Sequence, residues 1–109
     1  MEILQYLNAG AYESLTPGNT ATGITAAIKQ PTSGEFKNLP AIAALITVED
    51  NSARFTMDGT TPTASVGHLI TAGQSYVITG AGSVSAFKCI DAVSGVASNI
   101  KVTTFFKNT

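Results

Sequence analysis

The sequence predicts an all-β protein, folded as a single antiparallel β-sandwich of jelly-roll type with about seven or eight short strands. Three observations indicate this fold. Apolar and polar residues alternate in short runs, each run ends at a cluster of Gly, Asn, Asp or Ser, and helix signals are scarce. With 109 residues, the chain has room for one domain.

The N-terminal segment differs from the rest of the chain. Residues 1–19 lack the alternation and reach Pro17-Gly18 near their end, so they are predicted to form an arm or irregular segment. Its tyrosines, Tyr6 and Tyr12, need a surface to cover, on the same chain or on a neighbour. Residues 20–109 are assigned to the sandwich.

The first predicted strands follow this arm. Residues 20–30, "TATGITAAIKQ", are rich in Thr and Ile and form one strand, and residues 29–40 form a loop that carries Phe36. Residues 40–50 space Ala and Leu almost as a helix does, but their Ile, Thr and Val favour a strand. Because both faces of this strand are apolar, we expect it to be central and covered on each side.

Four later runs alternate clearly. In "SARFTM", Ala53, Phe55 and Met57 share one face, with Arg54 on the other. The same period occurs in "QSYVIT", "SAFKCID" and "NIKVTTFF". The Gly-rich "TGAGS" at 79–83 lacks the context of a nucleotide-binding loop and is predicted to be a hairpin turn.

The strand count leaves two architectures. Eight strands in two facing sheets match a jelly roll, and seven would fit an immunoglobulin-like sandwich. The Cys–Trp–Cys hallmark of the second is missing, because the chain has one Cys and no Trp.

The stretch 53–68, "ARFTMDGTTPTASVGH", gathers the residues that look most like a site. Asp58-Gly59 predicts a tight turn, because Gly tolerates positive φ and Asp bonds its own backbone locally. Pro62 cannot donate to a sheet ladder, so it indicates an edge or a loop. His68, the only histidine, is predicted to start the next strand. We interpret Asp58, Gly59 and Pro62 as structural turn residues.

No catalytic, cofactor or metal site is predicted, and we expect the protein not to be an enzyme. Ser65 and Asp58 lie near His68 in sequence, but neither sits on a nucleophile elbow. One histidine and one cysteine, Cys89, cannot supply a zinc site, and Cys89 is predicted to be a small buried hydrophobe. Residues 49–51, Glu-Asp-Asn, could form one edge of a calcium site but are better explained as a β-turn.

The low charge content limits the classes of partner that the protein is expected to bind. Charged residues make up 12%, about half of the usual ~25%. With a net charge of −1 and no basic cluster, we expect no nucleic-acid partner, and with no long apolar run we expect no membrane span. A weakly charged surface rich in Thr, Ser and Ala suits a protein that meets other protein surfaces.

The segment "ARFTMDGTTPTASVGHLITAGQSYVITG", with "VSAFKCIDAVSG" after it, resembles small virion proteins of tailed bacteriophages over roughly residues 41–106. The resemblance implies a non-enzymatic structural protein of the capsid decoration (cement) type. Such a protein is made in the host cytoplasm, forms a homotrimer on the capsid exterior, binds the major capsid protein and holds capsomers together. A tail or head-fibre component, or a head–tail adaptor, is an alternative within this class.

The motif Arg-Phe-Thr-x-Asp-Gly-Thr-x-Pro-Thr also resembles β-sandwich repeats appended to chitobiases and other carbohydrate-active enzymes. This second resemblance implies a carbohydrate-binding or spacer module without catalytic residues. Sugar platforms need exposed aromatic faces, and the chain has no Trp and three Tyr. A third hypothesis, a cupin-type enzyme, lacks the three histidines of metal-dependent cupins.

Overall fold

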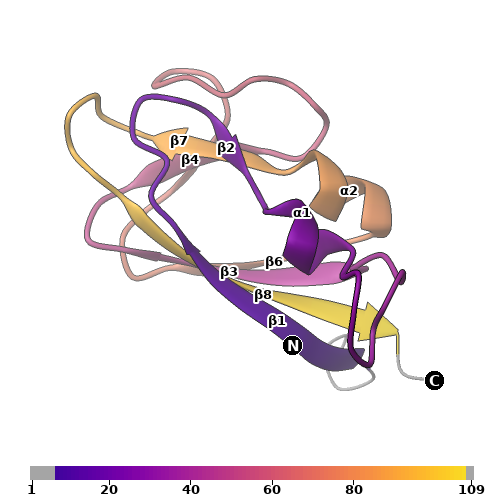
Figure 1. The fold of residues 1–109 in the computed structure, drawn as a ribbon. Coiled ribbons are helices and arrows are strands. Elements are labelled where there is room, and N and C mark those ends of the chain that lie inside the picture. The colour runs from indigo at the N-terminus through magenta and orange to yellow at the C-terminus, as the bar shows by residue number, and fades with distance from the viewer. Residues whose placement is uncertain (1–6, 108–109) are drawn as a thin grey trace.

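The structure, a computed structural model, describes residues 7–107. Within this range, two antiparallel sheets of four strands face each other, as Figure 1 shows. Two short helices, α1 (Ala26–Lys29) and α2 (Ala81–Ala86), lie at one end of the sandwich. The strands are β1 (Leu7–Leu15), β2 (Thr22–Gly23), β3 (Ala43–Glu49), β4 (Ala53–Thr56), β5 (His68–Ile70), β6 (Ser75–Thr79), β7 (Lys88–Asp91) and β8 (Asn99–Lys107).

The strand order is that of a jelly roll. The long sheet has the order β1-β8-β3-β6, and the short sheet has the order β2-β7-β4-β5. Each strand of the first half pairs with its counterpart in the second half, so β1 pairs with β8, β2 with β7, β3 with β6 and β4 with β5. The predicted all-β sandwich of about eight strands is confirmed.

The core lies between the two inner faces. Every second residue of β8 is buried there, namely Ile100, Val102, Thr104 and Phe106. The strand β3 lies between β8 and β6, which confirms its predicted central place. Its inner residues are buried, whereas Leu45 and Thr47 on the other face are only partly covered. The short sheet contributes Ala53, Phe55 and Cys89.

The predicted arm is largely a strand. Residues 7–15 form β1, which pairs with β8 from Leu7 opposite Lys107 to Leu15 opposite Ile100. The prediction of an irregular segment is therefore wrong for these residues, and the sandwich begins before residue 20. A bulge between Ala9 and Ala11 interrupts the alternation that would have marked the strand. Residues 1–6 of the predicted arm, with Tyr6, lie outside the described residues.

Two further local predictions are wrong. Residues 20–30 contain only the two-residue β2, followed by α1. Residues 79–83 are not a hairpin turn, because β6 ends at Thr79 and Gly80, with φ of 99°, leads into α2. Val84 explains this helix: its side chain is buried, and its backbone N–H donates to the Gly80 carbonyl at 3.0 Å.

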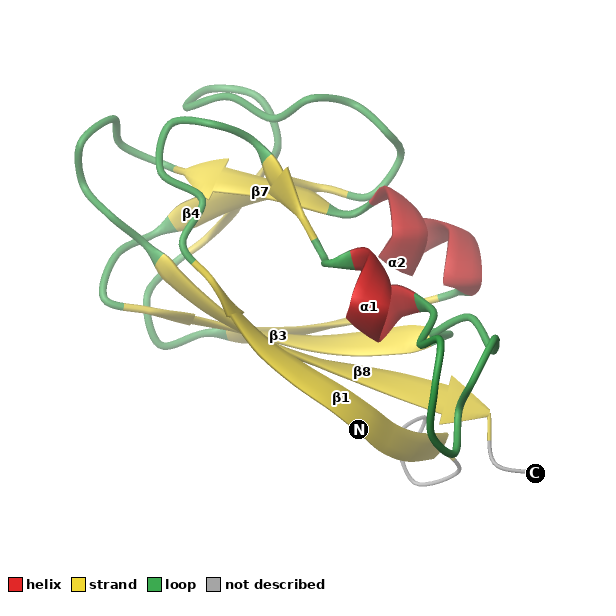
Figure 2. Cartoon of the chain, in the orientation of Figure 1, coloured by secondary structure: helices red, strands yellow, loops and turns green. Residues whose placement is uncertain are grey.

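The two helices lie side by side at one end of the sheets (Figure 2), where Lys29 Nζ donates to the Ser85 carbonyl oxygen at 3.3 Å. Both are far too short to cross a membrane, and the described part of the chain contains no other helix.

Candidate functional site

One side of the sandwich is formed by two edge strands that follow each other in the chain. β5 is the edge of the short sheet and pairs only with β4, and β6 is the edge of the long sheet and pairs only with β3. The turn at residues 71–74 joins them, where Gln74 Oε1 accepts the Thr71 backbone N–H at 3.0 Å. The two sheets therefore present their free edges on the same side.

Three aromatic rings meet between these edges. Phe55 is paired in register with His68, so both side chains lie on the inner face of the short sheet. Tyr76 is paired with Ile46 and lies on the inner face of the long sheet. The ring centroid of Phe55 is 5.5 Å from that of His68 and 5.2 Å from that of Tyr76.

A cavity of about 300 Å³ opens at this place. We call it the aromatic slot, and none of its side chains is Asp, Glu, Lys or Arg. It is lined by Phe55, Met57, His68, Leu69, Ile70, Gln74, Ser75 and Tyr76. Such a slot can bind a neutral group; it holds no nucleophile paired with a base, which acyl transfer or hydrolysis needs.

The predicted turn residues Asp58 and Gly59 follow Met57, which lines the slot. Asp58 Oδ1 accepts the backbone N–H of Thr60 at 3.0 Å, and this bond is the main cause of the lowered pKa of the Asp58 carboxyl. Gly59 has φ of 91°, a left-handed conformation that favours glycine. His68 begins β5, as predicted. Asp58 thus acts as a turn acceptor.

Pro62 lies in the loop between β4 and β5, which is one of the two places predicted for it, and its side chain is buried there. Arg54 holds this loop over the outer face of the short sheet, because its Nε donates to the Ala64 carbonyl at 2.7 Å and its guanidinium to the Gly67 carbonyl at 3.0 Å. Sequence reasoning gave Arg54 no such role.

The remaining candidates have structural roles. Cys89 is buried and its thiol donates to the Thr22 carbonyl at 3.3 Å; burial is the main cause that raises its pKa to about 12. Asp50 has φ of 71° in the turn after β3, and Asn51 Nδ2 donates to the Ala97 carbonyl at 2.7 Å. Among residues 7–107, no three His, Cys, Asp or Glu side chains gather as a metal site requires.

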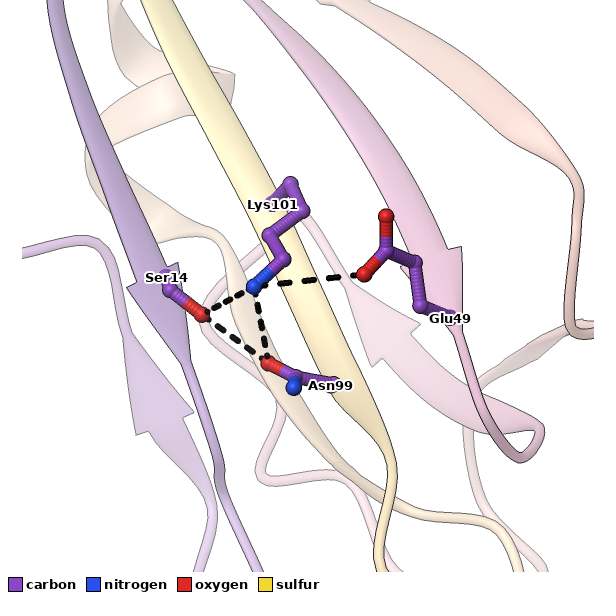
Figure 3. Close-up of polar contacts among 4 residues, drawn as sticks. All are labelled: Ser14, Glu49, Asn99 and Lys101. Atoms are coloured by element: carbon purple, nitrogen blue, oxygen red, sulfur yellow. Dashed lines mark hydrogen bonds and ion pairs between the residues drawn. The ribbon is translucent and has the colours of Figure 1, made fainter.

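A second surface is the outer face of the long sheet. At one end of it, Lys101 Nζ donates to Ser14 Oγ at 2.9 Å and to Asn99 Oδ1 at 3.5 Å, and lies 3.9 Å from Glu49 Oε1, as Figure 3 shows. Ser14 Oγ also donates to Asn99 Oδ1 at 2.9 Å. This polar cluster links β1, β8 and β3 across the sheet.

Between the polar cluster and Lys107 at the end of β8, the outer face carries no charged side chain in two rows. One row across the four strands runs Tyr12, Thr103, Leu45 and Val77, and the next includes Phe105, Ala43 and Thr79. Tyr12 is 60% exposed. The outer face is therefore a weakly charged surface between these two ends.

No family model, no curated protein and no solved structure matches the chain.

Sequence reasoning placed Tyr76 in a strand but did not connect it with Phe55 or His68. The sequence does contain a signal for this. Tyr76 is two residues before the buried Ile78 in an alternating run, so both side chains lie on the inner face of the strand.

Proposed function

We propose that this chain is a non-enzymatic structural protein of a tailed-phage virion: a capsid decoration protein that binds the outer shell. The observation that carries the proposal is the weakly charged outer face of the long sheet, with the exposed Tyr12 on it. The jelly-roll fold agrees with it, since viral capsid proteins use this fold, but lectins and cupins use it too, so fold alone does not decide.

The dimensions of the outer face suit a protein interface. The strands have nine (β1), nine (β8), seven (β3) and five (β6) residues, each residue about 3.3 Å long and each strand about 4.8 Å wide. The face therefore measures roughly 480 Å², more than half of the ~800 Å² that each partner contributes to an interface of standard size. Side chains at the rim would supply the remainder.

The chemistry of the face supports the same use. Interface cores are depleted of charge and enriched in aromatic residues, as in the row that contains Tyr12 and Leu45. The charges of Lys101 and Glu49 face each other at one end, where they would orient the contact more than strengthen it.

The partner in this proposal is the major capsid protein. Three copies around a local three-fold site would form a closed ring, and each would contact neighbouring capsomers. Because the protein would bind the assembled shell and not the dissociated subunits, binding would stabilise the shell by mass action.

Sedimentation with emptied phage shells tests the proposal. We expect the wild-type protein to sediment with shells and to have a trimeric mass in light scattering. Tyr12→Lys should abolish sedimentation because it places a charge in the interface core. The matched control is Val93→Lys, at a residue 58% exposed in the loop after β7, and it should sediment as wild type does. A strict monomer that stays in the supernatant would contradict the proposal.

A further inference from the structure

The aromatic slot lies on a different part of the molecule from the outer face of the long sheet. Its floor is Phe55, which is 5% exposed, and its two walls come from different sheets. Tyr76 on one wall is 43% exposed, and His68 on the other is also exposed. Two aromatic rings thus stand partly free above a buried third ring.

Three exposed polar side chains that line the slot form what we call its rim: His68, Gln74 and Tyr76. Tyr76 has a phenolic hydroxyl and His68 has two ring nitrogens. The amide of Gln74 is oriented by its bond from the Thr71 backbone N–H to Oε1, which leaves Nε2 as a donor. A ligand would therefore meet an apolar floor and a rim of neutral donors and acceptors.

This combination selects among ligand classes. An anionic or cationic ligand would lose hydration without meeting an opposite charge in the slot, which is unfavourable. A purely apolar ligand would leave the rim groups of Tyr76, His68 and Gln74 without partners. A neutral sugar ring fits both parts, since its C–H face packs on aromatic rings and its hydroxyls bond to donors and acceptors.

The size of the slot sets the length of the ligand. Ligand pockets range from about 300 to 1,000 Å³. At about 300 Å³, the slot is at the lower limit and holds a single ring rather than an extended chain. We propose that the aromatic slot binds one ring of a neutral saccharide, stacked on Tyr76 and hydrogen-bonded by His68 and Gln74.

Saturation-transfer NMR of the full chain tests this binding. The probes are the methyl glycosides of glucose, galactose, mannose and N-acetylglucosamine at millimolar concentration. We expect transfer to the ring protons of at least one glycoside, and about tenfold weaker binding for Tyr76→Ala and His68→Ala. Val93→Ala is the control: it shortens an exposed side chain in the loop after β7, outside the slot, and should bind as wild type does.

Two results would overturn the proposal: transfer to none of the four glycosides, or equal binding by wild type and Tyr76→Ala. Thermal unfolding of each variant shows whether it is folded, and Tyr76→Leu replaces Tyr76→Ala if the alanine variant is not. Transfer to p-cresol, a mimic of a tyrosine side chain, without transfer to any glycoside would also overturn it and would indicate an aromatic peptide instead. Shell sedimentation is a separate readout, because Tyr76 is not on the outer face.

Discussion

Glu13 on β1 and Thr25 at the start of α1 are joined by two hydrogen bonds: Oε2 accepts the Thr25 backbone N–H at 2.8 Å, and Oε1 accepts its hydroxyl at 2.5 Å. Glu13 is paired with Val102, so its side chain points to the inner side of the long sheet. An inward-pointing charge is one way to protect an edge strand such as β1. The two hydrogen bonds lie on the side of the sandwich where β1 and β2 are the edge strands. The aromatic slot lies on the opposite side, where β5 and β6 are the edge strands.

The first prediction concerns this closure. Glu13→Ala should lower the free energy of unfolding by about 1–2 kcal/mol, because both hydrogen bonds to a charged acceptor are lost. Urea unfolding measures the change. The control is Glu35→Ala, at an exposed residue without an ion pair or hydrogen bond in the described part of the chain, which should shift stability by less than about 0.5 kcal/mol. Equal stability of the two variants would contradict a structural role for Glu13.

The second prediction concerns the Asp58-Gly59 turn. An added Cβ at Gly59 would meet no atom within 4 Å, so its only cost is the backbone φ of 91°. Gly59→Ala should therefore destabilise the protein by about 1 kcal/mol.

Gly82 in α2 provides the matched control, because it also has open space around it but no positive φ. Gly82→Ala should stabilise by about 0.5–1 kcal/mol, since alanine favours the helix. The same sign for both variants in thermal unfolding would refute this assignment of the strain.

The third prediction concerns Thr104 in the core. It is 0% exposed, and its hydroxyl has no hydrogen-bond partner among residues 7–107. Thr104→Val should raise the free energy of unfolding by about 1 kcal/mol, because a buried unpaired hydroxyl is removed at nearly constant shape. Thr103→Val, on the outer face of the same strand, should change it by less than about 0.5 kcal/mol. A loss of stability in Thr104→Val would mean that the hydroxyl does have a partner.

The fourth prediction concerns the pH dependence caused by Cys89. Its pKa in the folded state, about 12, is above the ordinary value of 9.0, chiefly because the thiol is buried. Between these pH values the unfolded chain releases a proton that the folded chain keeps, so this contribution to stability is full below pH 9 and decreases toward pH 12. The slope is at most about 1.4 kcal/mol per pH unit.

Urea midpoints measured from pH 8 to pH 11 check this dependence. The urea midpoint of Cys89→Ala should fall less steeply with pH than that of wild type. The two proteins differ only in the thiol, so the difference between the two slopes belongs to Cys89. Parallel declines would contradict the burial of the thiol.

Regular alternation predicted most strands, although in the run 85–91 only Lys88–Asp91 form a strand, because α2 extends to Ala86. In β8, Ile100 and Phe106 are buried as expected, because each inner position is filled by a side chain that the core requires. Phe55 and His68 also occupy the predicted strand and strand start. A strand with one buried face has apolar residues at every second position, and this alternation is visible in the sequence.

Other elements could not be predicted, for physical reasons. β1 has a bulge at Gly10 and an inward Glu13, so its inner face does not look apolar. Gly10 itself is required by a tertiary contact, since an added Cβ would lie 2.5 Å from the Phe106 ring. The aromatic slot joins Tyr76 of one sheet to Phe55 of the other, and that relation depends on strand order, which local patterns do not contain.

Cryo-electron microscopy of the particle encoded with this protein is the decisive test of the proposed virion role. We predict jelly-roll density with this strand order on the outer surface of the capsid at local three-fold sites. The outer face of the long sheet, with Tyr12 and Leu45, should be turned toward the major capsid protein. A complete particle whose surface and protein content lack this chain would contradict the account.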